Sequence, residues 1–309
     1  MISCTFEELA LHLISQGLNK HIAPEQISNT VHEPSFENLT AEKLKVLLQL
    51  ILEQDTFSKK YLLKYLLQTG QSCESFASAV REYLDRTCYL QGSLVGFSSP
   101  DYPPQLRHIK SPPIILHAFG NIHLLTFPGY SIIGARKASS SAIKDSFELG
   151  RDLARLGFTI TSGGAFGCDI AAHQGVLASG TDPCPAIVVL AGGLAKMYPR
   201  HHQNIFKKIL QSGGVIISEK LWDEPCRAHD FPVRNRIISG VNPLTIVVQA
   251  GNRSGTLITA KEALDQGREV IVAKPQHIEV GYEGSLALAE DGAPLFENCH
   301  AIISYLESY

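Results

Sequence analysis

The apolar residues follow a helical spacing from residue 1 to about residue 90, with no strand-like alternation. Phe6, Leu9 and Leu13 mark a first helix. Thr40 is a plausible N-cap for the next long apolar stretch, and Gly70 is a plausible end of the one after it. The stretch SCESFASAVREYLDR (72–86) predicts a further helix. A Gly-, Ser- and Pro-rich segment, QGSLVGFSSPDYPP, then marks a boundary, so the pattern predicts a small all-α domain over 1–92 and a second domain over 93–309.

After the boundary, short runs rich in Val and Ile alternate with helical patterns. The runs predict strands at 130–135, 158–163, 186–193, 214–219, 244–250 and 268–275. The segments between them predict helices near 141–156, 168–180, 201–211 and 255–266. Apolar runs without polar alternation are typical of strands buried on both faces. Strands and helices that alternate with short connections predict an α/β fold with a doubly wound, mostly parallel sheet.

Glycines and basic residues recur where predicted strands lead into helices. Arg136 and Lys137 follow Gly134, Lys196 follows Gly192-Gly193, and Arg253 lies in GNRSGT (251–256). The junction at 162–167 contains Gly163 and Gly164. Ligands of open α/β sheets bind at this edge, where backbone N–H groups can approach an anion. Turn geometry alone also explains a single such glycine, but four junctions together indicate an anion-binding trough. None of them has the dinucleotide or nucleoside-triphosphate fingerprint.

Two further segments are basic. Lys196 to His202 continues to Lys207-Lys208 without an acidic residue, and Phe231 lies close in sequence to Arg234 and Arg236. An aromatic ring that stacks on bases beside guanidinium groups on phosphates is the basic chemistry of single-strand binding. The alternative is that Phe231 is a core residue and that Arg236 forms a structural ion pair.

The charge is unevenly distributed along the chain. The net charge is −3, yet residues 101–278 hold 13 acidic and 19 basic residues, a local balance of +6, while residues 279–309 hold six acids and no Lys or Arg. A basic middle is compatible with an anion-binding face. The seven cysteines form no CxxC pair, so neither a metal site nor a disulfide framework is predicted, and scattered thiols fit a reducing cytoplasm. No secretory signal or membrane-spanning run is predicted.

The sequence offers little for catalysis. Asp169 and His173 lie four residues apart on a predicted helix, which could suggest acid–base chemistry or half a metal site. No third ligand or nucleophile motif accompanies them, so a structural hydrogen-bonding role for His173 is favoured. Hydrolase and metalloprotease signatures are missing.

The order of motifs resembles that of the DNA-processing protein A family (DprA, also called Smf). The blocks that carry the resemblance over about 100–297 are YP (102–103), Leu106 with PP (112–113), GAR (134–136), SGGAFGCD (162–169) with His173, YP (198–199), SE (218–219), FPVRNR (231–236) and SGTLITA (254–260).

The resemblance implies an extended Rossmann-like domain preceded by a domain similar to a sterile alpha motif. It implies a homodimer that binds single-stranded DNA without sequence preference and loads the recombinase RecA during natural transformation, with no enzymatic activity and no cofactor. The family's phosphate contacts would fall on Arg136, Gly163, Gly164 and Arg234, with Lys137 and Arg227 nearby and Phe231 as the stacking ring. We also expect contacts from Lys196, Arg236 and Arg253, and no C-terminal winged helix.

Three positions depart from the family: Gln249 replaces an acid, Gln276 replaces the Gly of a Pro-Gly pair, and Ser285 replaces an Asn. Two other hypotheses remain open. The chain could be a Rossmann-like nucleotide phosphoribohydrolase, although Thr259 stands where those enzymes carry a catalytic Glu. It could also be a scaffold for recombination partners that has little affinity for DNA.

Overall fold

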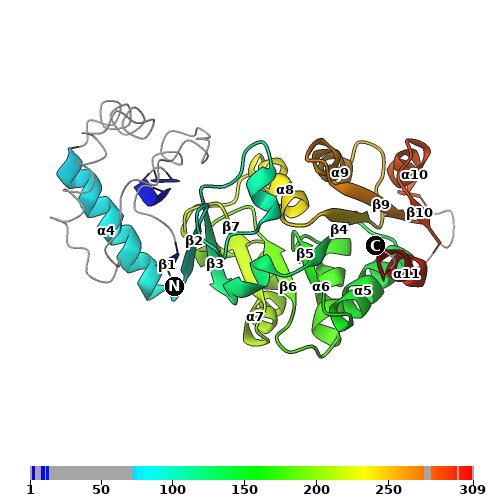
Figure 1. Ribbon diagram of the computed structural model, residues 1–309, viewed down its shortest axis with the longest axis horizontal. Helices are drawn as coiled ribbons and strands as arrows, with labels where there is room; N and C mark the ends of the chain where they lie inside the picture. Colours follow the sequence, from blue (N-terminus) through cyan, green and yellow to red (C-terminus); the bar gives the residue numbers. More distant parts are fainter. Residues whose placement is uncertain are drawn as a thin grey trace.

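The computed structural model describes residues 2–3, 8–10, 12–13, 72–274, 280–297 and 299–307. These residues build one sheet with helices on both faces (Figure 1). The strands are β1 Ile2–Ser3, β2 Ser93–Gly96, β3 Ile115–Gly120, β4 Gly129–Ile133, β5 Thr159–Ser162, β6 Ala186–Val189, β7 Val215–Ser218, β8 Leu244–Val247, β9 Glu269–Ala273 and β10 Leu295–Phe296. The helices are α4 Cys73–Tyr89, α5 Ser140–Arg155, α6 Cys168–Ala178, α7 Gln203–Gln211, α8 Asp230–Val241, α9 Gly255–Asp265, α10 Glu283–Glu290 and α11 Cys299–Glu307, with short 3-10 turns η3 Gln105–His108, η4 Ile122–Thr126, η5 Leu194–Lys196 and η6 Arg200–His202.

The sheet is doubly wound. Its ten strands lie in the order β1-β2-β3-β7-β6-β5-β4-β8-β9-β10. From β7 to β10 all neighbours are parallel. The chain runs from β4 outward through β5 and β6 to β7, and then returns to the other side of β4 with β8 and β9. The strand order therefore reverses between β4 and β8, where a parallel sheet of this kind opens a ligand crevice.

The prediction of an α/β fold with a mostly parallel sheet is confirmed. Each of the six predicted strands and four predicted helices is present, with its ends within a few residues of the expected position. The helix expected at 72–86 is α4, and residues 8–10 and 12–13 are helical, as the spacing of Leu9 and Leu13 predicts. The helices predicted from the segments that contain Thr40 and Gly70, and the departure at Gln276, lie outside the described residues.

One edge of the sheet differs from the sequence-based expectation. Strand β3 runs antiparallel to both β2 and β7. The prediction that no strand precedes residue 92 is wrong, because Ile2–Ser3 pair in parallel with Leu94 and Val95 of β2. Two residues are too few for an alternation to be recognised. Without β1, the backbone N–H and C=O groups on the outer side of β2 would have no strand partner, and β1 pairs with part of them. Division into domains 1–92 and 93–309 remains a prediction.

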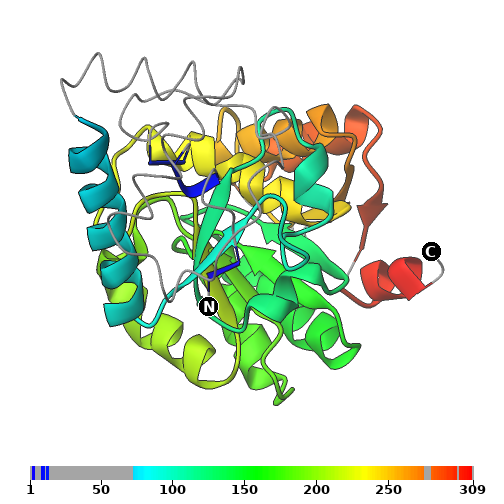
Figure 2. The same ribbon diagram turned by 60° about the vertical axis from the view of Figure 1, so that its left-hand side comes forward.

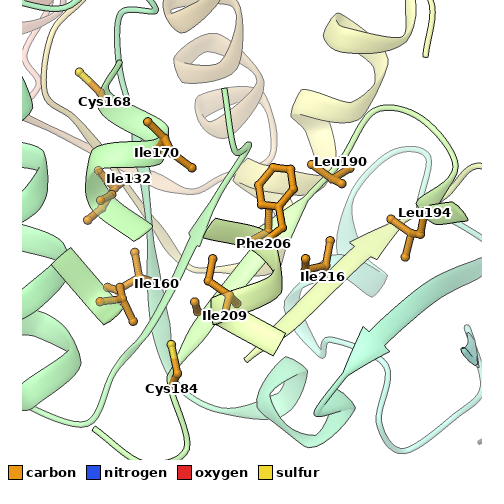
Figure 3. Packing of buried hydrophobic residues seen from close by; sticks show 14 of the residues in the cluster. Ile132, Ile160, Cys168, Ile170, Cys184, Leu190, Leu194, Phe206, Ile209 and Ile216 are labelled. Atoms are coloured by element: carbon orange, nitrogen blue, oxygen red, sulfur yellow. The ribbon is translucent and has the colours of Figure 1, made fainter. Parts of the chain in front are cut away.

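Two hydrophobic cores lie on the two faces of the sheet, because successive side chains of a strand point to opposite faces. Ile132 of β4 faces the first core and its neighbour Ile133 faces the second. Helices α5, α6, α7 and α11 cover the first core, whose packing is shown in Figure 3. Helices α8 and α9 cover the second core, on the other side of the sheet (Figure 2).

The segment before the parallel sheet is anchored in the second core. Tyr102 is fully buried and its hydroxyl donates to the carbonyl of Pro113 at 2.7 Å. Leu106 of η3 is also fully buried and packs on Gly240 of α8. These residues of the YP and PP blocks therefore stabilise the fold and position α8. Among the described residues, no helix is both long and apolar enough to cross a membrane.

Helices α5 and α6 pack closely because glycine faces the neighbouring backbone. A Cβ at Gly175 would lie 1.9 Å from the carbonyl oxygen of Phe147. We expect Gly175→Ala to lower the free energy of unfolding by about 1–3 kcal/mol, since backbone on both sides has to move. The matched control is Gly255→Ala at the start of α9, where no atom lies within 4 Å of the added Cβ. Urea denaturation of both variants tests this, and equal stability of the two would contradict the close helix contact.

Candidate nucleic-acid interface

A cleft of about 610 Å³ opens at the switch point of the sheet. It lies at the carboxyl ends of the parallel strands, where loops enter the helices. Three loops and one helix form its walls: residues 133–137 after β4, Ala165 and Asp169 at the β5–α6 junction, residues 251–259 after β8, and residues 228–238 at the start of α8. The sequence predicted a trough from these junctions, and the structure brings three of the four to this cleft.

Helix α8 turns one regular stripe of residues toward the cleft. Phe231, Arg234, Asn235 and Ile238 all line it. Their spacing of three and four residues places them on one face of an α-helix. Pro232 lies in the first turn of α8, where its missing N–H group costs no helical hydrogen bond. The FPVRNR block therefore acts as a helical face rather than as a linear cluster.

Arg136 and Phe231 contact each other in the wall of the cleft, where Arg136 is exposed and Phe231 is half-buried. The guanidinium carbon of Arg136 lies 4.8 Å from the centroid of the Phe231 ring, a cation–π distance. The Tyr198 ring packs edge-on against the Phe231 ring, with 6.1 Å between the two ring centroids. Arg136 and the neighbouring Lys137 are exposed, and both line the cleft. A strand that enters here meets cationic groups and an aromatic ring together.

Arg234 lies at the floor of the cleft and is only 6 % exposed. One guanidinium nitrogen donates to the carbonyl of Gly163 at 2.7 Å and also to that of Val189. Burial lowers the pKa of Arg234 to about 10, and nearby Asp169 opposes this shift. Arg234 thus ties the ends of β5 and β6 to α8. Its phosphate contact remains a prediction.

Asp169 is the single carboxyl group among the residues that line the cleft. Burial raises its pKa, and the charge of Arg234 partly offsets that effect. A Cβ at Gly163 would lie 2.7 Å from both Arg234 Nη1 and Asp169 Oδ2, so only glycine leaves room for the two charged groups. Gly164 has φ +64°, which glycine adopts without strain. The structure therefore explains this Gly pair by packing, while its DNA contact stays a prediction.

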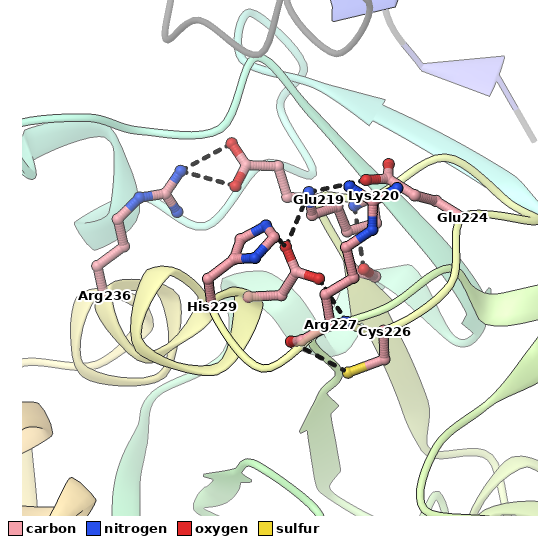
Figure 4. Close-up of polar contacts among 9 residues, drawn as sticks. Glu219, Lys220, Glu224, Cys226, Arg227, His229 and Arg236 are labelled. Atoms are coloured by element: carbon pink, nitrogen blue, oxygen red, sulfur yellow. Dashed lines mark hydrogen bonds and ion pairs between the residues drawn. The ribbon is translucent and has the colours of Figure 1, made fainter.

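Arg236 points away from the cleft. It lies two residues beyond Arg234, and residues at this spacing do not share a helix face. Its Nη2 donates to both carboxylate oxygens of Glu219 at 2.7 Å (Figure 4). Of the alternatives weighed for Arg236, the structural ion pair is the one present. Phe231 is half-buried and lines the cleft rather than the core.

The loop between β7 and α8 holds the start of α8 in place. Lys220 Nζ lies 2.9 Å from Glu224 and 3.1 Å from Asp230, the first residue of α8. Asp230 also accepts a hydrogen bond from the backbone N–H of Arg227 at 2.7 Å. The side chain of Arg227 remains exposed beside Ala228, which lines the cleft.

The N-terminus of α9 lines the cleft, and α5 begins at Ser140, a short distance in sequence after the lining residue Lys137. Ser139 caps α5 by accepting from Ala142 N, and Ser254 caps α9 by accepting from Leu257 N. Neither helix has an acidic residue in its first turn. Their partial positive charges therefore add to those of the side chains. Arg253, exposed and at φ +54°, lies directly before Ser254.

Gln249 and Ser285, two of the positions that depart from the family, form hydrogen bonds with the loops next to the cleft. Gln249 is buried; its Oε1 accepts from Ser139 N at 2.9 Å and its Nε2 donates to the carbonyl of Val280 at 3.5 Å. A carboxylate could not make the second bond, so the amide joins two loops without adding a buried negative charge. Ser285 accepts from Ala250 N at 2.7 Å.

The remaining predicted residue, Lys196, is exposed in η5 and does not line the cleft. Sequence reasoning missed Asn235, Ile238 and Tyr198 as neighbours of the predicted residues. The helical spacing of Phe231, Arg234 and Asn235 was the signal that could have found the first two. Among the described residues, no group of three or more His, Cys, Asp or Glu side chains could hold a metal ion.

His173 lies in the core below the site rather than in the cleft. Burial lowers its pKa from 6.5 to about 4, an effect that the backbone of Ser162 partly opposes. The unfolded chain binds this proton more readily than the folded one, so stability present above pH 6.5 is lost as the pH falls toward 4. His173→Gln should remove up to about 3 kcal/mol of that loss. Urea unfolding of both proteins at several pH values tests this. If the unfolding free energies of the two proteins change equally between pH 6.5 and pH 4, the prediction is wrong.

Fold and site together define a Rossmann-like α/β protein with a basic, aromatic-edged cleft at its switch point. Comparisons with known proteins extend this description. The sequence model of the DNA recombination-mediator protein A family matches residues 93–307. The chain therefore belongs to the DNA recombination-mediator protein A family.

Several relatives support the assignment. Protein Smf of Escherichia coli is 36% identical over 250 residues, which is 78% of this chain and 66% of that protein. The DNA processing protein DprA of Bacillus subtilis is 34% identical over 64% of this chain and 66% of the relative. Matches with the first curated relatives span about half to two thirds of their lengths.

Two solved structures are similar to this chain. DNA processing protein A of Helicobacter pylori, described for its single-stranded DNA binding mode, aligns with a TM-score of 0.63 and 29% identity over 71% of this chain and 96% of that one. DprA of Streptococcus pneumoniae aligns with a TM-score of 0.69 over 98% of this chain and 94% of that one; at 23% identity it supports the fold.

Proposed function

We propose that this protein binds single-stranded DNA without sequence preference through the cleft at the switch point. The observation that carries the proposal is the Arg136 guanidinium, exposed and 4.8 Å from the Phe231 ring at the rim of that cleft. Phosphates contact cationic groups while unpaired bases stack on aromatic rings, and stacking tolerates any base. The single-stranded DNA binding described for the Helicobacter pylori protein supports the same substrate class.

The shape of the site favours a single strand over a duplex. The Phe231 ring forms part of the wall of a concave cleft, so a base reaches it only when the base is unpaired and unstacked. Backbone N–H groups at the N-terminus of α9 and the exposed basic residues then contact phosphates.

We propose a binding role rather than an enzymatic one. In the phosphoribohydrolase hypothesis a catalytic carboxylate would occupy position 259. Thr259 is buried there and its hydroxyl donates to the carbonyl of Gly255 at 3.2 Å. Asp169, the carboxyl group that lines the cleft, lies beside the buried Arg234. Release of free base from AMP by the purified protein would instead support an enzyme.

Fluorescence anisotropy with a labelled oligo(dT) and a duplex of equal length tests the binding proposal. We expect tighter binding to the single strand and an affinity that falls steeply with salt, because phosphate binding releases counterions. Preference for the duplex, or affinity that does not change with salt, would contradict the proposal and favour a scaffold role.

From the family resemblance we further propose that the protein acts in the cytoplasm as a homodimer and delivers single strands to RecA. The description of the family as recombination mediators supports this role. Sedimentation equilibrium tests the dimer. A RecA strand-exchange assay on pre-coated single strands tests delivery, and no acceleration by the protein would count against it.

A further inference from the structure

Phe166 is a large apolar side chain that the cleft does not use. It lies in the loop between β5 and α6, and 45% of its surface is exposed. Its neighbour Ala165 lines the cleft. Glycines at φ +64° and +78°, Gly164 and Gly167, bracket the loop, and a Cβ at Gly167 would lie 2.1 Å from the carbonyl oxygen of Ala135. The loop that presents Phe166 is therefore packed directly against the loop that presents Arg136.

The Phe166 ring is held from one side. Its centroid lies 4.4 Å from that of the buried His202 imidazole and 5.8 Å from that of His201. His202 is itself fixed, because its Nδ1 lies 2.9 Å from the carbonyl oxygen of Gly164 and its ring packs edge-on against Phe206. A ring fixed in this way loses little conformational entropy when a ligand covers its open surface.

The surface next to Phe166 is basic. Arg200, His201, Lys207 and Lys208 are exposed on η6 and α7, and no acidic residue occurs from 196 to 208. The same segment carries Tyr198, 51% exposed, whose ring reaches Phe231 at the cleft. The segment 198–202 therefore contacts an aromatic ring of the cleft at one end and Phe166 at the other.

We propose that Phe166 is a second base-stacking position, and that a single strand leaves the cleft, crosses Phe166 and continues over the basic side chains of η6 and α7. Two exposed rings, Phe166 and Tyr198, and the exposed cations of η6 and α7 belong to this route, and rings combined with cations are what sequence-tolerant single-strand binding uses. This inference rests on the proposed single-strand binding of the cleft and extends its footprint. The set of Phe166, Tyr198, Arg200, Lys207 and Lys208 is called the second track below.

Oligonucleotide length separates the second track from the cleft. We expect Phe166→Ala in the full chain to weaken binding of an oligo(dT) of about 20 nucleotides by about tenfold, since one stacked base is lost. An oligo(dT) of about 5 nucleotides, which fills the cleft alone, should bind the variant as it binds the unmodified protein. The matched control is Phe127→Ala: Phe127 is 52% exposed and precedes the amino end of β4, whereas the cleft lies at the carboxyl ends of the strands.

Phe166→Trp supplies a readout that a purely structural role would not change. The chain has one tryptophan, the buried Trp222. We expect the variant to keep the affinity of the unmodified protein for the long oligo(dT) and its new indole fluorescence to be quenched by that ligand but not by the short one.

The possible results are distinct. If Phe166→Ala and Phe127→Ala bind the long oligo(dT) equally, or if the indole is not quenched at saturation, the second track is wrong while the cleft proposal stands. If the unmodified protein binds neither length, the proposed function itself fails. Thermal melting of each variant identifies any loss of affinity that comes from unfolding. If Phe166→Ala is unfolded, quenching of the Phe166→Trp indole by the long oligo(dT) tests the second track instead.

Discussion

Replacing Arg136 with alanine is expected to weaken oligo(dT) binding by about 10–100-fold, while the melting temperature stays unchanged. A hydrogen bond to a charged group contributes about 1.5–3 kcal/mol, and the Arg136 guanidinium is exposed at the cleft rim, where a phosphate can reach it. Its contact with the Phe231 ring is lost as well. The salt dependence should also become shallower, by about 0.7 in the log–log slope for one lost phosphate contact to a single strand.

Arg155→Ala is the matched control for this prediction. Arg155 lies in the last turn of α5, the helix that follows the Arg136 loop, and its side chain is 55% exposed. The same charge is removed at the opposite end of the helix, so binding should change little. Equal effects of the two substitutions would mean that overall charge, rather than the cleft, determines affinity.

Arg234→Ala is expected to act on stability first, lowering the free energy of unfolding by about 3 kcal/mol. The buried guanidinium donates to the carbonyls of Gly163 and Val189 and offsets the charge of Asp169. Its removal leaves two buried acceptors unsatisfied, and the pKa of Asp169 should rise further. Urea denaturation measures the loss, and binding should fall in parallel because the β5–α6 loop loses its anchor.

The same experiment separates two roles for Arg234. Arg227→Ala, at an exposed position in the loop before α8, should leave the unfolding free energy nearly unchanged. Arg234→Lys keeps the charge but lacks the planar guanidinium, so it should recover only part of the stability. If Arg234→Ala unfolds like the unmodified protein but has lost DNA binding, Arg234 is a direct DNA contact rather than an anchor.

The central sheet could be predicted because its strands are continuous apolar runs. Strands such as 186–189 and 215–218 are buried on both faces, so composition alone marks them. Strand β3 and helix α8 were not predicted as elements. The region of β3 carries the polar His117 between apolar residues, and α8 has a proline in its first turn and contains Gly240. Their structures depend on tertiary contacts, such as the pairing of β3 with β7.

The candidate site was only partly predictable for a geometric reason. Arg136 and Lys137 follow a strand directly, so the edge of the sheet fixes where they lie. Arg234 and Arg236 are only two residues apart in sequence. Because the segment is helical, Arg234 lines the cleft while Arg236 points toward Glu219. Without knowing that this segment is helical, the two arginines could not be separated. The packing function of Gly163 likewise follows from its contact with Arg234, which lies 71 residues further along the chain.

Hydrogen–deuterium exchange of the full chain with and without saturating oligo(dT) tests the central claim most directly. If the cleft binds the single strand, backbone amides should gain protection at residues 134–137, 228–235 and 251–256, the segments that form its walls. Residues 126–129, at the amino end of β4 and away from the cleft, should not change. Protection confined to the amino ends of the strands, or no protection at the cleft despite measurable binding, would contradict the assignment of the cleft as the DNA site.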